Sequence, residues 1–132
     1  MERNDTLALE RLRAHDPARP PSEYAEQVAV CQWLARARPD VFWFAIPNGG
    51  SRHLHEAVKL KNSGVRPGVP DLFVAAARPP WQGLFLEMKR RSGSTVSPAQ
   101  RKVMAVLEAA GYRAAVCRGA DEAVKAIEEY LG

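Results

Sequence analysis

The stretch that decides the fold runs from Gly64 to Lys89 and reads GVRPGVPDLFVAAARPPWQGLFLEMK. Two apolar runs flank the segment 78–83, whose prolines and glycine do not continue a strand. The simplest arrangement is an antiparallel hairpin with its turn centred on this segment, which places Asp71 opposite Glu87. Because successive side chains of a strand alternate between faces, Glu87 and Lys89 share one face. The sequence therefore predicts two carboxylates and an ammonium at one end of a hairpin.

The same register pairs Phe73 with Phe85 further along the hairpin. Two carboxylates are costly to place beside a core unless a cation occupies the site. Taken separately, an aspartate before an apolar run is typical of a turn, and a Glu-x-Lys sequence is typical of a solvated strand edge. The pairing of the two fragments across one hairpin favours a metal-assisted active site.

The bulk composition is that of one globular domain. The chain has 132 residues, of which 46% are hydrophobic and 26% charged, enough for a single core. Its net charge of +4 suits nucleic acid without requiring it. Cys31 and Cys117 lie within apolar runs and are expected to be buried thiols in a reducing compartment. No apolar stretch approaches the roughly 18 residues of a membrane span, so we expect a soluble, cytoplasmic protein.

The first 21 residues differ from the rest of the chain. They contain a short charged helical segment, Thr6 to Arg13, followed by the proline-rich segment 15–21. Because proline interrupts a helix, the sequence predicts a flexible N-terminal arm over residues 1–21 and a single domain over residues 22–132.

The first helix of the domain is predicted from Ser22, a typical N-cap residue, to about Arg36. Glu23 lies in its first turn, where an acidic side chain complements the helix dipole. Gln27 lies one turn further on the same face, and Glu26 points elsewhere. Either glutamate is a candidate for an acidic residue near the hairpin, and the sequence leaves the two open.

The remaining elements complete an α/β pattern. The apolar run 41–46 predicts a central strand buried on both faces and ended by the loop 47–50. A helix over 51–62 ends before Gly64, a strand covers 112–117, and a last helix starts at Asp121. The order of elements favours a three-layer α/β fold with a central mixed β-sheet flanked by helices, the hairpin carrying the site.

The helix after the hairpin has two start signals, because Ser97 is placed as its cap and Pro98 in its first turn. Gln100 is placed to complete a capping box, which is a structural alternative to any role in the site. Gly111 is a natural C-terminal cap. The predicted core face of this helix comprises Val103, Met104, Val106, Leu107 and Ala110.

Several cations near the hairpin are candidates for phosphate contacts. Each one alone is typical of a solvated surface, but as a group they suit the backbone of a nucleic acid. The predicted nucleic-acid-binding cations are Lys59, Lys61, Arg66, Arg90 and Arg91.

Pro70-Asp71 and Glu87-Met88-Lys89 resemble the two half-motifs of the PD-(D/E)xK nuclease superfamily, and the chain from about Ser22 to Leu131 resembles its VRR-NUC branch. The resemblance implies a restriction-endonuclease-like fold and catalytic roles for Asp71, Glu87 and Lys89. It also implies that the Met88 carbonyl is a metal ligand. Asp71 and Glu87 are hard oxygen ligands suited to Mg²⁺, for which Mn²⁺ substitutes.

Three further residues receive roles from the same resemblance. Glu23, with Gln27, matches the acidic residue and glutamine of the family's first helix. Gln100 matches a glutamine found in family members and is a candidate for a catalytic role besides its cap. Asn48, in an Asn-Gly-Gly sequence, is expected near the scissile strand.

The function predicted in this way is that of a metal-dependent DNA endonuclease. The resemblance extends to free-standing members that act as homodimers on branched DNA, including four-way junctions. One alternative is a non-catalytic DNA-binding module of the same fold, which would have no need of Asp71, Glu87 and Lys89 together. The other is a restriction-type nuclease, for which the chain shows no added recognition domain.

Overall fold

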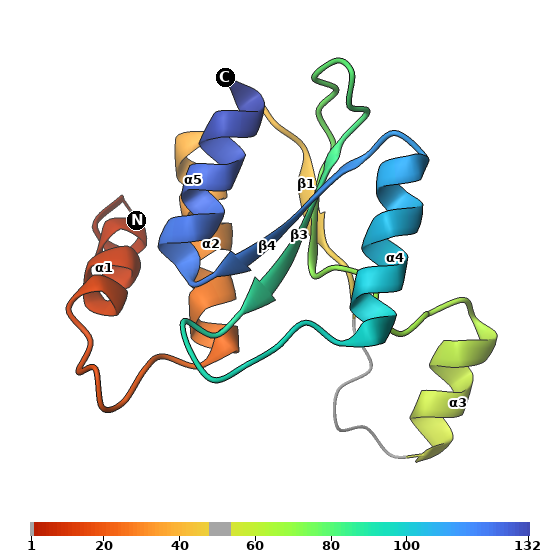
Figure 1. Ribbon diagram of the computed structural model, residues 1–132. Coiled ribbons are helices and arrows are strands. Elements are labelled where there is room, and N and C mark those ends of the chain that lie inside the picture. Colours follow the sequence, from red (N-terminus) through yellow and green to blue (C-terminus); the bar gives the residue numbers. More distant parts are fainter. Residues whose placement is uncertain (1, 48–53) are drawn as a thin grey trace.

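The computed structural model describes residues 2–47 and 54–132 of the chain. Its elements follow the predicted helix and strand order, and the helical segment predicted for Thr6 to Arg13 lies within an N-terminal helix (Figure 1). They are α1 (Glu2–Arg13), α2 (Glu23–Ala37), β1 (Trp43–Ala45), α3 (Leu54–Asn62), β2 (Leu72–Val74), β3 (Leu84–Lys89), α4 (Pro98–Ala109), β4 (Arg113–Arg118) and α5 (Ala120–Leu131). Among the described residues, no helix is long and apolar enough to cross a membrane.

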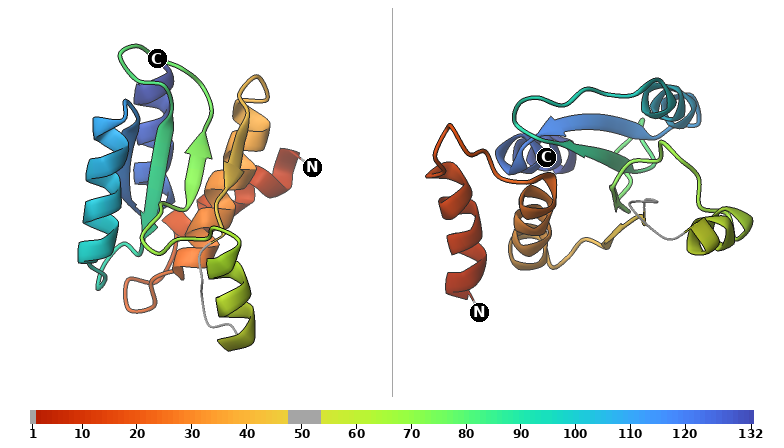
Figure 2. Two further views of the ribbon diagram at one scale, coloured as in Figure 1. Left: turned by 90° about the vertical axis from the view of Figure 1, so that its right-hand side faces the viewer. Right: turned by 90° about the horizontal axis from the view of Figure 1, so that it is seen from below.

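The sheet is mixed, with the strand order β1-β2-β3-β4. β1 and β3 both run antiparallel to β2, whereas β4 runs parallel to β3. Helices α2 and α5 lie on one side of the sheet and α4 on the other (Figures 1 and 2). The predicted three-layer α/β architecture is confirmed.

The predicted hairpin register is also confirmed. Leu72 pairs with Leu86 and Phe73 pairs with Phe85. The pairing continues past the end of β2, because the Asp71 N–H donates to the Leu86 carbonyl at 2.9 Å. Asp71 therefore lies opposite Glu87 at the end of the hairpin that is remote from its turn.

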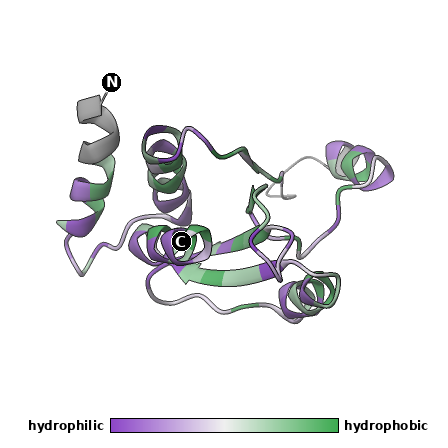
Figure 3. Ribbon diagram, turned by 90° about the horizontal axis from the view of Figure 1, so that it is seen from above, coloured by the Kyte–Doolittle hydropathy of each residue, from purple (hydrophilic) through white to green (hydrophobic). Residues whose placement is uncertain are grey.

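One face of the sheet forms the main hydrophobic core. It carries the fully buried Leu72, Val74, Leu86 and Met88 on the central strands. These side chains belong to one cluster with apolar residues of α2 and α5, including Ala29, Val30, Leu34 and Ile127. Figure 3 shows that the strands are rich in hydrophobic residues and that α2 and α5 lie beside the sheet. The core fixes β3 against α2, which is the contact that positions the site.

The expectation that the run 41–46 is a central strand was wrong. Within residues 2–47 and 54–132, β1 is an edge strand that pairs with β2 alone, and Phe44 is 43% exposed. Trp43 packs against the core, but Phe42 and Phe44 lie on the other face and contact each other instead. The continuous apolar run therefore belongs to a strand with one face packed on the core and one exposed aromatic face.

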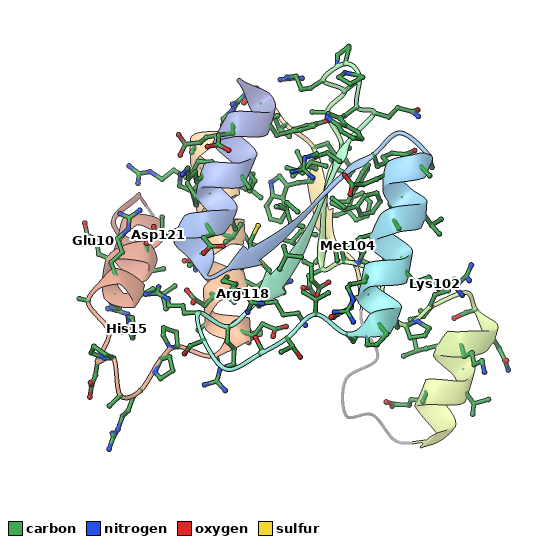
Figure 4. The ribbon with its side chains drawn as sticks, in the orientation of Figure 1. Glu10, His15, Lys102, Met104, Arg118 and Asp121 are labelled. Carbon is green, nitrogen blue, oxygen red and sulfur yellow. The ribbon has the colours of Figure 1, made fainter. Side chains whose placement is uncertain are left out.

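α4 is less buried than its apolar pattern suggests. Ser97 caps it as predicted, and Gly111 follows its C-terminal end with a positive φ of 97°. However, no residue of α4 is fully buried, and Val106 is 61% exposed. The reason is the position of α4, which packs mainly against β4 and so covers only part of its side of the sheet. Met104 lies on the side of α4 toward the sheet and Lys102 on the outer side (Figure 4).

The N-terminal segment differs from the expectation of an arm separate from the domain. α1 packs against α2, and Leu9 and Leu12 are buried in the same core cluster. An ion pair of 2.7 Å between Arg13 and Asp121 joins α1 to α5. Apolar side chains spaced along a short helix are enough to dock it, a signal that the proline-rich segment obscured. That residues 22–132 form a complete unit stays a prediction.

Candidate active site

Three charged side chains predicted for catalysis meet at the open end of the hairpin. Asp71, Glu87 and Lys89 are all buried, with exposed fractions of 9%, 2% and 8%. The Lys89 Nζ lies 3.8 Å from the Glu87 Oε1. The Met88 N–H donates to the Asp71 Oδ2 at 2.7 Å, which fixes the aspartate across the two strands. Burial of three charged groups at one point costs stability, and such clusters are typical of functional sites.

Glu87 is buried with its hydrogen bonds incomplete. Its Oε1 accepts a hydrogen bond of 2.8 Å from the Gln100 side chain, while its buried Oε2 has no hydrogen-bond partner. Burial, followed by the negative charge of Asp71, raises the pKa of Glu87 to about 8. Lys89 opposes this shift but does not cancel it. The single ammonium of Lys89 therefore does not offset the burial of Glu87 beside a second carboxylate.

Gln100 completes the predicted capping box and also contacts the candidate site. Its side-chain Oε1 accepts from the Ser97 N–H at 2.9 Å and its own N–H donates to the Ser97 Oγ at 3.1 Å, which completes the capping box. Its Nε2 is then free to donate to Glu87. The cap of α4 therefore orients the amide toward the carboxylate, and a catalytic role for Gln100 stays a prediction.

The loop before Asp71 approaches the first turn of α4 very closely. A Cβ on Gly68 would lie 2.8 Å from the backbone of Ala99, and its φ of +84° also favours glycine. A groove of about 370 Å³ lies beside this contact, between the loop and α4. Its lining includes the cations Arg66 and Lys102 and the apolar Val69 and Val103. Lys102 could not be singled out from the sequence, because an isolated lysine on a helix is ordinary.

The structure separates the two glutamates of α2. Burial and the charge of Asp71 raise the pKa of Glu23, while Lys89 and Arg90 lower it. Glu23 therefore faces the same cluster of charges as Asp71. Glu26 is fully buried but points to Arg91 instead. Of the two candidates it is Glu23 that the structure places near the site, and its catalytic role stays a prediction.

Arg91 is held by Glu26 in a two-pronged ion pair. Its Nε donates to Oε2 at 2.7 Å and its Nη2 donates to Oε1 at 3.0 Å. Glu26 also accepts the Ala120 N–H at 3.1 Å, and the Arg91 Nη1 lies 3.0 Å from the His15 Nδ1. His15 lies between α1 and the domain (Figure 4). This geometry favours a structural role for Arg91, and its proposed phosphate contact is untested.

The other candidate cations occupy exposed positions. Lys59 and Lys61 lie in the last turn of α3, and Arg66 and Arg90 lie in the loops that flank the hairpin. α3 extends away from the sheet, so the cations are spread over a broad surface (Figure 2). Asn48 lies outside the described residues.

The donor set fits a hard divalent cation held in part by water. Across residues 2–47 and 54–132, no three His, Cys, Asp or Glu side chains converge as a metal site by themselves. Asp71 and Glu87 do face each other, and the Glu87 Oε2 is a buried oxygen without a partner. Mg²⁺ is commonly bound by one or two carboxylates with several waters, whereas structural zinc requires four protein ligands. The site therefore suits Mg²⁺ or Mn²⁺ better than zinc.

Comparison with known proteins agrees with this geometry. The family described as "VRR-NUC domain" matches residues 10–121. A solved structure described as "VRR_NUC domain protein" is 30% identical, with a TM-score of 0.74 over 86% of this chain and 90% of that chain. No curated protein sequence matches significantly.

Proposed function

Because the chain belongs to the VRR-NUC family, a nuclease-type domain, we propose that it is a metal-dependent DNA endonuclease that hydrolyses phosphodiester bonds in branched DNA. The observation that carries the proposal is the state of Glu87. A carboxylate with an unpaired buried oxygen, opposite Asp71 and beside Lys89, is a poor structural element but a good binding site for a cation.

The metal would be held by Asp71, Glu87 and the Met88 carbonyl. When bound, Mg²⁺ supplies charge neutralisation at the phosphate and a water of lowered pKa. The Gln100 amide holds the Glu87 Oε1 in place. Because Asp71 is fixed through the Met88 N–H, both carboxylates are preorganised on the rigid strands.

Lys89 is the cationic group of the site. Its Nζ projects from the same strand face as Glu87 and lies 3.8 Å from that carboxylate. A compact ammonium in this position would orient the attacking water and stabilise negative charge that develops on the phosphate. Glu23 faces the same cluster, where it would accept a hydrogen bond or proton from that water.

Branched substrates and a homodimer belong to the same proposal. Two copies related by a two-fold axis would present two sites to symmetric strands, as paired incision of a four-way junction requires. The exposed cations Lys59, Lys61, Arg66 and Arg90 would contact backbone phosphates, which favours reading of DNA shape over base sequence.

The test is cleavage of linear, flap and four-way-junction DNA by the purified protein with Mg²⁺, Mn²⁺ or EDTA. We expect cleavage only with metal, and a loss of about a thousand-fold for Asp71→Asn and Glu87→Gln. Glu108→Gln, which alters an exposed carboxylate on α4, is the matched control and should cleave normally.

Three results would contradict the proposal. Cleavage at a similar rate in EDTA would show that the reaction does not require a metal ion. Tight DNA binding without any cleavage would favour the non-catalytic DNA-binding module. Strong preference between two linear duplexes of different sequence would instead favour a restriction-type nuclease.

A further inference from the structure

The outer face of the sheet carries a continuous row of aromatic rings that the catalytic residues do not use. Neighbouring ring centroids lie 5.8 Å apart for Phe42 and Phe44, 5.5 Å for Phe44 and Phe73, and 4.5 Å for Phe73 and Phe85. Tyr112 ends the row, 5.5 Å from Phe85. The row therefore crosses the sheet from the edge strand β1 toward β4.

Exposure along the row is graded. Phe42 is 70% exposed and Phe44 is 43% exposed, whereas Phe73, Phe85 and Tyr112 are half-buried. α4 lies at the β4 end of this face (Figure 2). Two large exposed rings next to one another on an edge strand are unusual for a surface that meets only water.

The row is continuous with the candidate active site. Phe73 follows Asp71 by two residues and Phe85 precedes Glu87 by two residues, so all four side chains project from the same face of the hairpin. Along a strand, two residues span about 6.6 Å. The rings therefore begin one residue pair away from the carboxylates and lead away from them to the open edge.

Resting on the proposed function, we propose that Phe42 and Phe44 form a stacking platform for an unpaired base of the DNA substrate next to the scissile phosphate. Aromatic faces bind any base that is free to leave its helix, and they bind a base pair within a stacked duplex poorly. The platform gives the site a physical reason to prefer branched, bulged or frayed DNA over a continuous duplex.

A second copy of the chain is the other occupant that such a surface suggests. The continuity of the row with Asp71 and Glu87 favours the nucleic acid, because a protein partner seated on Phe42 and Phe44 would cover the approach to the site. The exposed cations on α3 and in the loop 64–70 also suit a phosphate backbone along this side.

The experiment uses two DNA probes of the same sequence, one fully paired and one with a single bulged 2-aminopurine. Binding is measured in EDTA, by fluorescence anisotropy for affinity and by 2-aminopurine quenching for stacking. The variants are Phe42→Leu, Phe44→Leu and the double variant, which keep apolar volume but remove the ring. Tyr24→Leu removes a 79% exposed ring outside the row and is the matched control.

We expect wild-type protein to quench the bulged probe and to bind it more tightly than the paired duplex. The double variant should lose the quenching and about ten-fold of the preference for the bulge, with unchanged affinity for the paired duplex. Tyr24→Leu should behave as wild type. Unchanged affinity for paired DNA also shows that the variants are folded.

An equal loss of affinity for both probes, or a preference altered less than two-fold, would overturn the platform. Conversion of a dimer to a monomer by the double variant, measured by sedimentation, would also overturn it and assign the face to a second copy. The two proposals fail separately. Quenching without any metal-dependent cleavage would contradict the nuclease proposal and support the stacking platform. Metal-dependent cleavage with an unchanged bulge preference in the variants would support the nuclease proposal and contradict the platform.

Discussion

Two glutamates are buried in this fold, and their environments are opposite. Glu26 is fully buried, and its carboxylate receives Arg91 in a two-pronged pair together with the Ala120 N–H. Glu87 is almost as buried, but it has one amide donor, an ammonium 3.8 Å away and an oxygen without a partner. Of these two glutamates, only Glu26 is paired with a guanidinium and has hydrogen bonds to both carboxylate oxygens.

The difference separates a structural charge from a functional one. A buried ion pair whose hydrogen bonds are all made costs little to keep and much to break. A buried carboxylate that is left incomplete costs stability in the folded state, and such groups cluster at sites that bind or react. Glu26 with Arg91 joins α2, the loop after β3 and the start of α5. Glu87 has the incomplete environment that we expect of the proposed cation site.

The largest expected effect comes from breaking the complete pair. Glu26→Ala should lower the free energy of unfolding by about 3 kcal/mol, because it leaves the Arg91 guanidinium without its partner. Urea unfolding of metal-free protein measures the change.

The matched change at the incomplete carboxylate should act in the opposite direction. Glu87→Gln removes a charge that the folded state tolerates poorly, so the metal-free variant should be at least as stable as wild type. Equal destabilisation by both changes would show that the two glutamates do not differ as described.

The second effect is a dependence of stability on pH to which Glu87 contributes through its raised pKa. Its pKa is raised from 4.5 to about 8 in the folded state, so the folded state binds the proton more tightly than the unfolded state does. The contribution to stability is complete below about pH 4.5 and is lost progressively as the pH rises toward 8. Over this range it amounts to a few kcal/mol, at about 1.4 kcal/mol for each unit of pKa shift.

Thermal unfolding in EDTA between pH 5 and 8 tests this effect. The decline in stability of wild type relative to Glu87→Gln should grow with pH, and added Mg²⁺ should reduce it by neutralising the carboxylate. Parallel curves for the two proteins would mean that Glu87 is ionised at neutral pH without penalty.

Much of the site was predictable because strand geometry is regular. An Asp and a Glu-x-Lys separated by a proline-rich turn have one plausible antiparallel register, and that register placed Asp71 opposite Glu87. Gln100 was predictable in part, because the capping box is a local motif, whereas its hydrogen bond to Glu87 depends on how α4 packs.

The sequence was ambiguous where two like residues stand close together. Glu23 and Glu26 both lie in the first turns of α2, and only the packing of α2 on β3 and α5 decides which one meets Arg91. The same holds for Arg90 and Arg91, which are neighbours in one basic loop. β1 was assigned wrongly to the sheet centre because its pattern does not show whether a helix covers its second face.

The third effect concerns the two glutamates of α2 in catalysis. Glu23→Gln should reduce turnover by about ten-fold with little loss of stability, since general acid–base groups contribute at least this much. Glu26→Gln should instead lower stability while the folded fraction retains most of its turnover. Steady-state cleavage and urea unfolding of both variants give the comparison. Normal turnover for Glu23→Gln, with loss for Glu26→Gln, would reverse the assignment.

The smallest effect distinguishes the neighbouring arginines in DNA binding. Arg90 is exposed, whereas the guanidinium of Arg91 is already engaged by Glu26. Each phosphate contact contributes about −0.9 to the slope of log K against log salt on duplex DNA. Arg90→Ala should therefore flatten the slope by about one contact, and Arg91→Lys, which keeps the charge, should leave it unchanged. Binding isotherms at several salt concentrations measure both slopes. An unchanged slope for Arg90→Ala would remove Arg90 from the interface, and a slope flattened by Arg91→Lys would mean that the Glu26 pair opens to let Arg91 contact DNA.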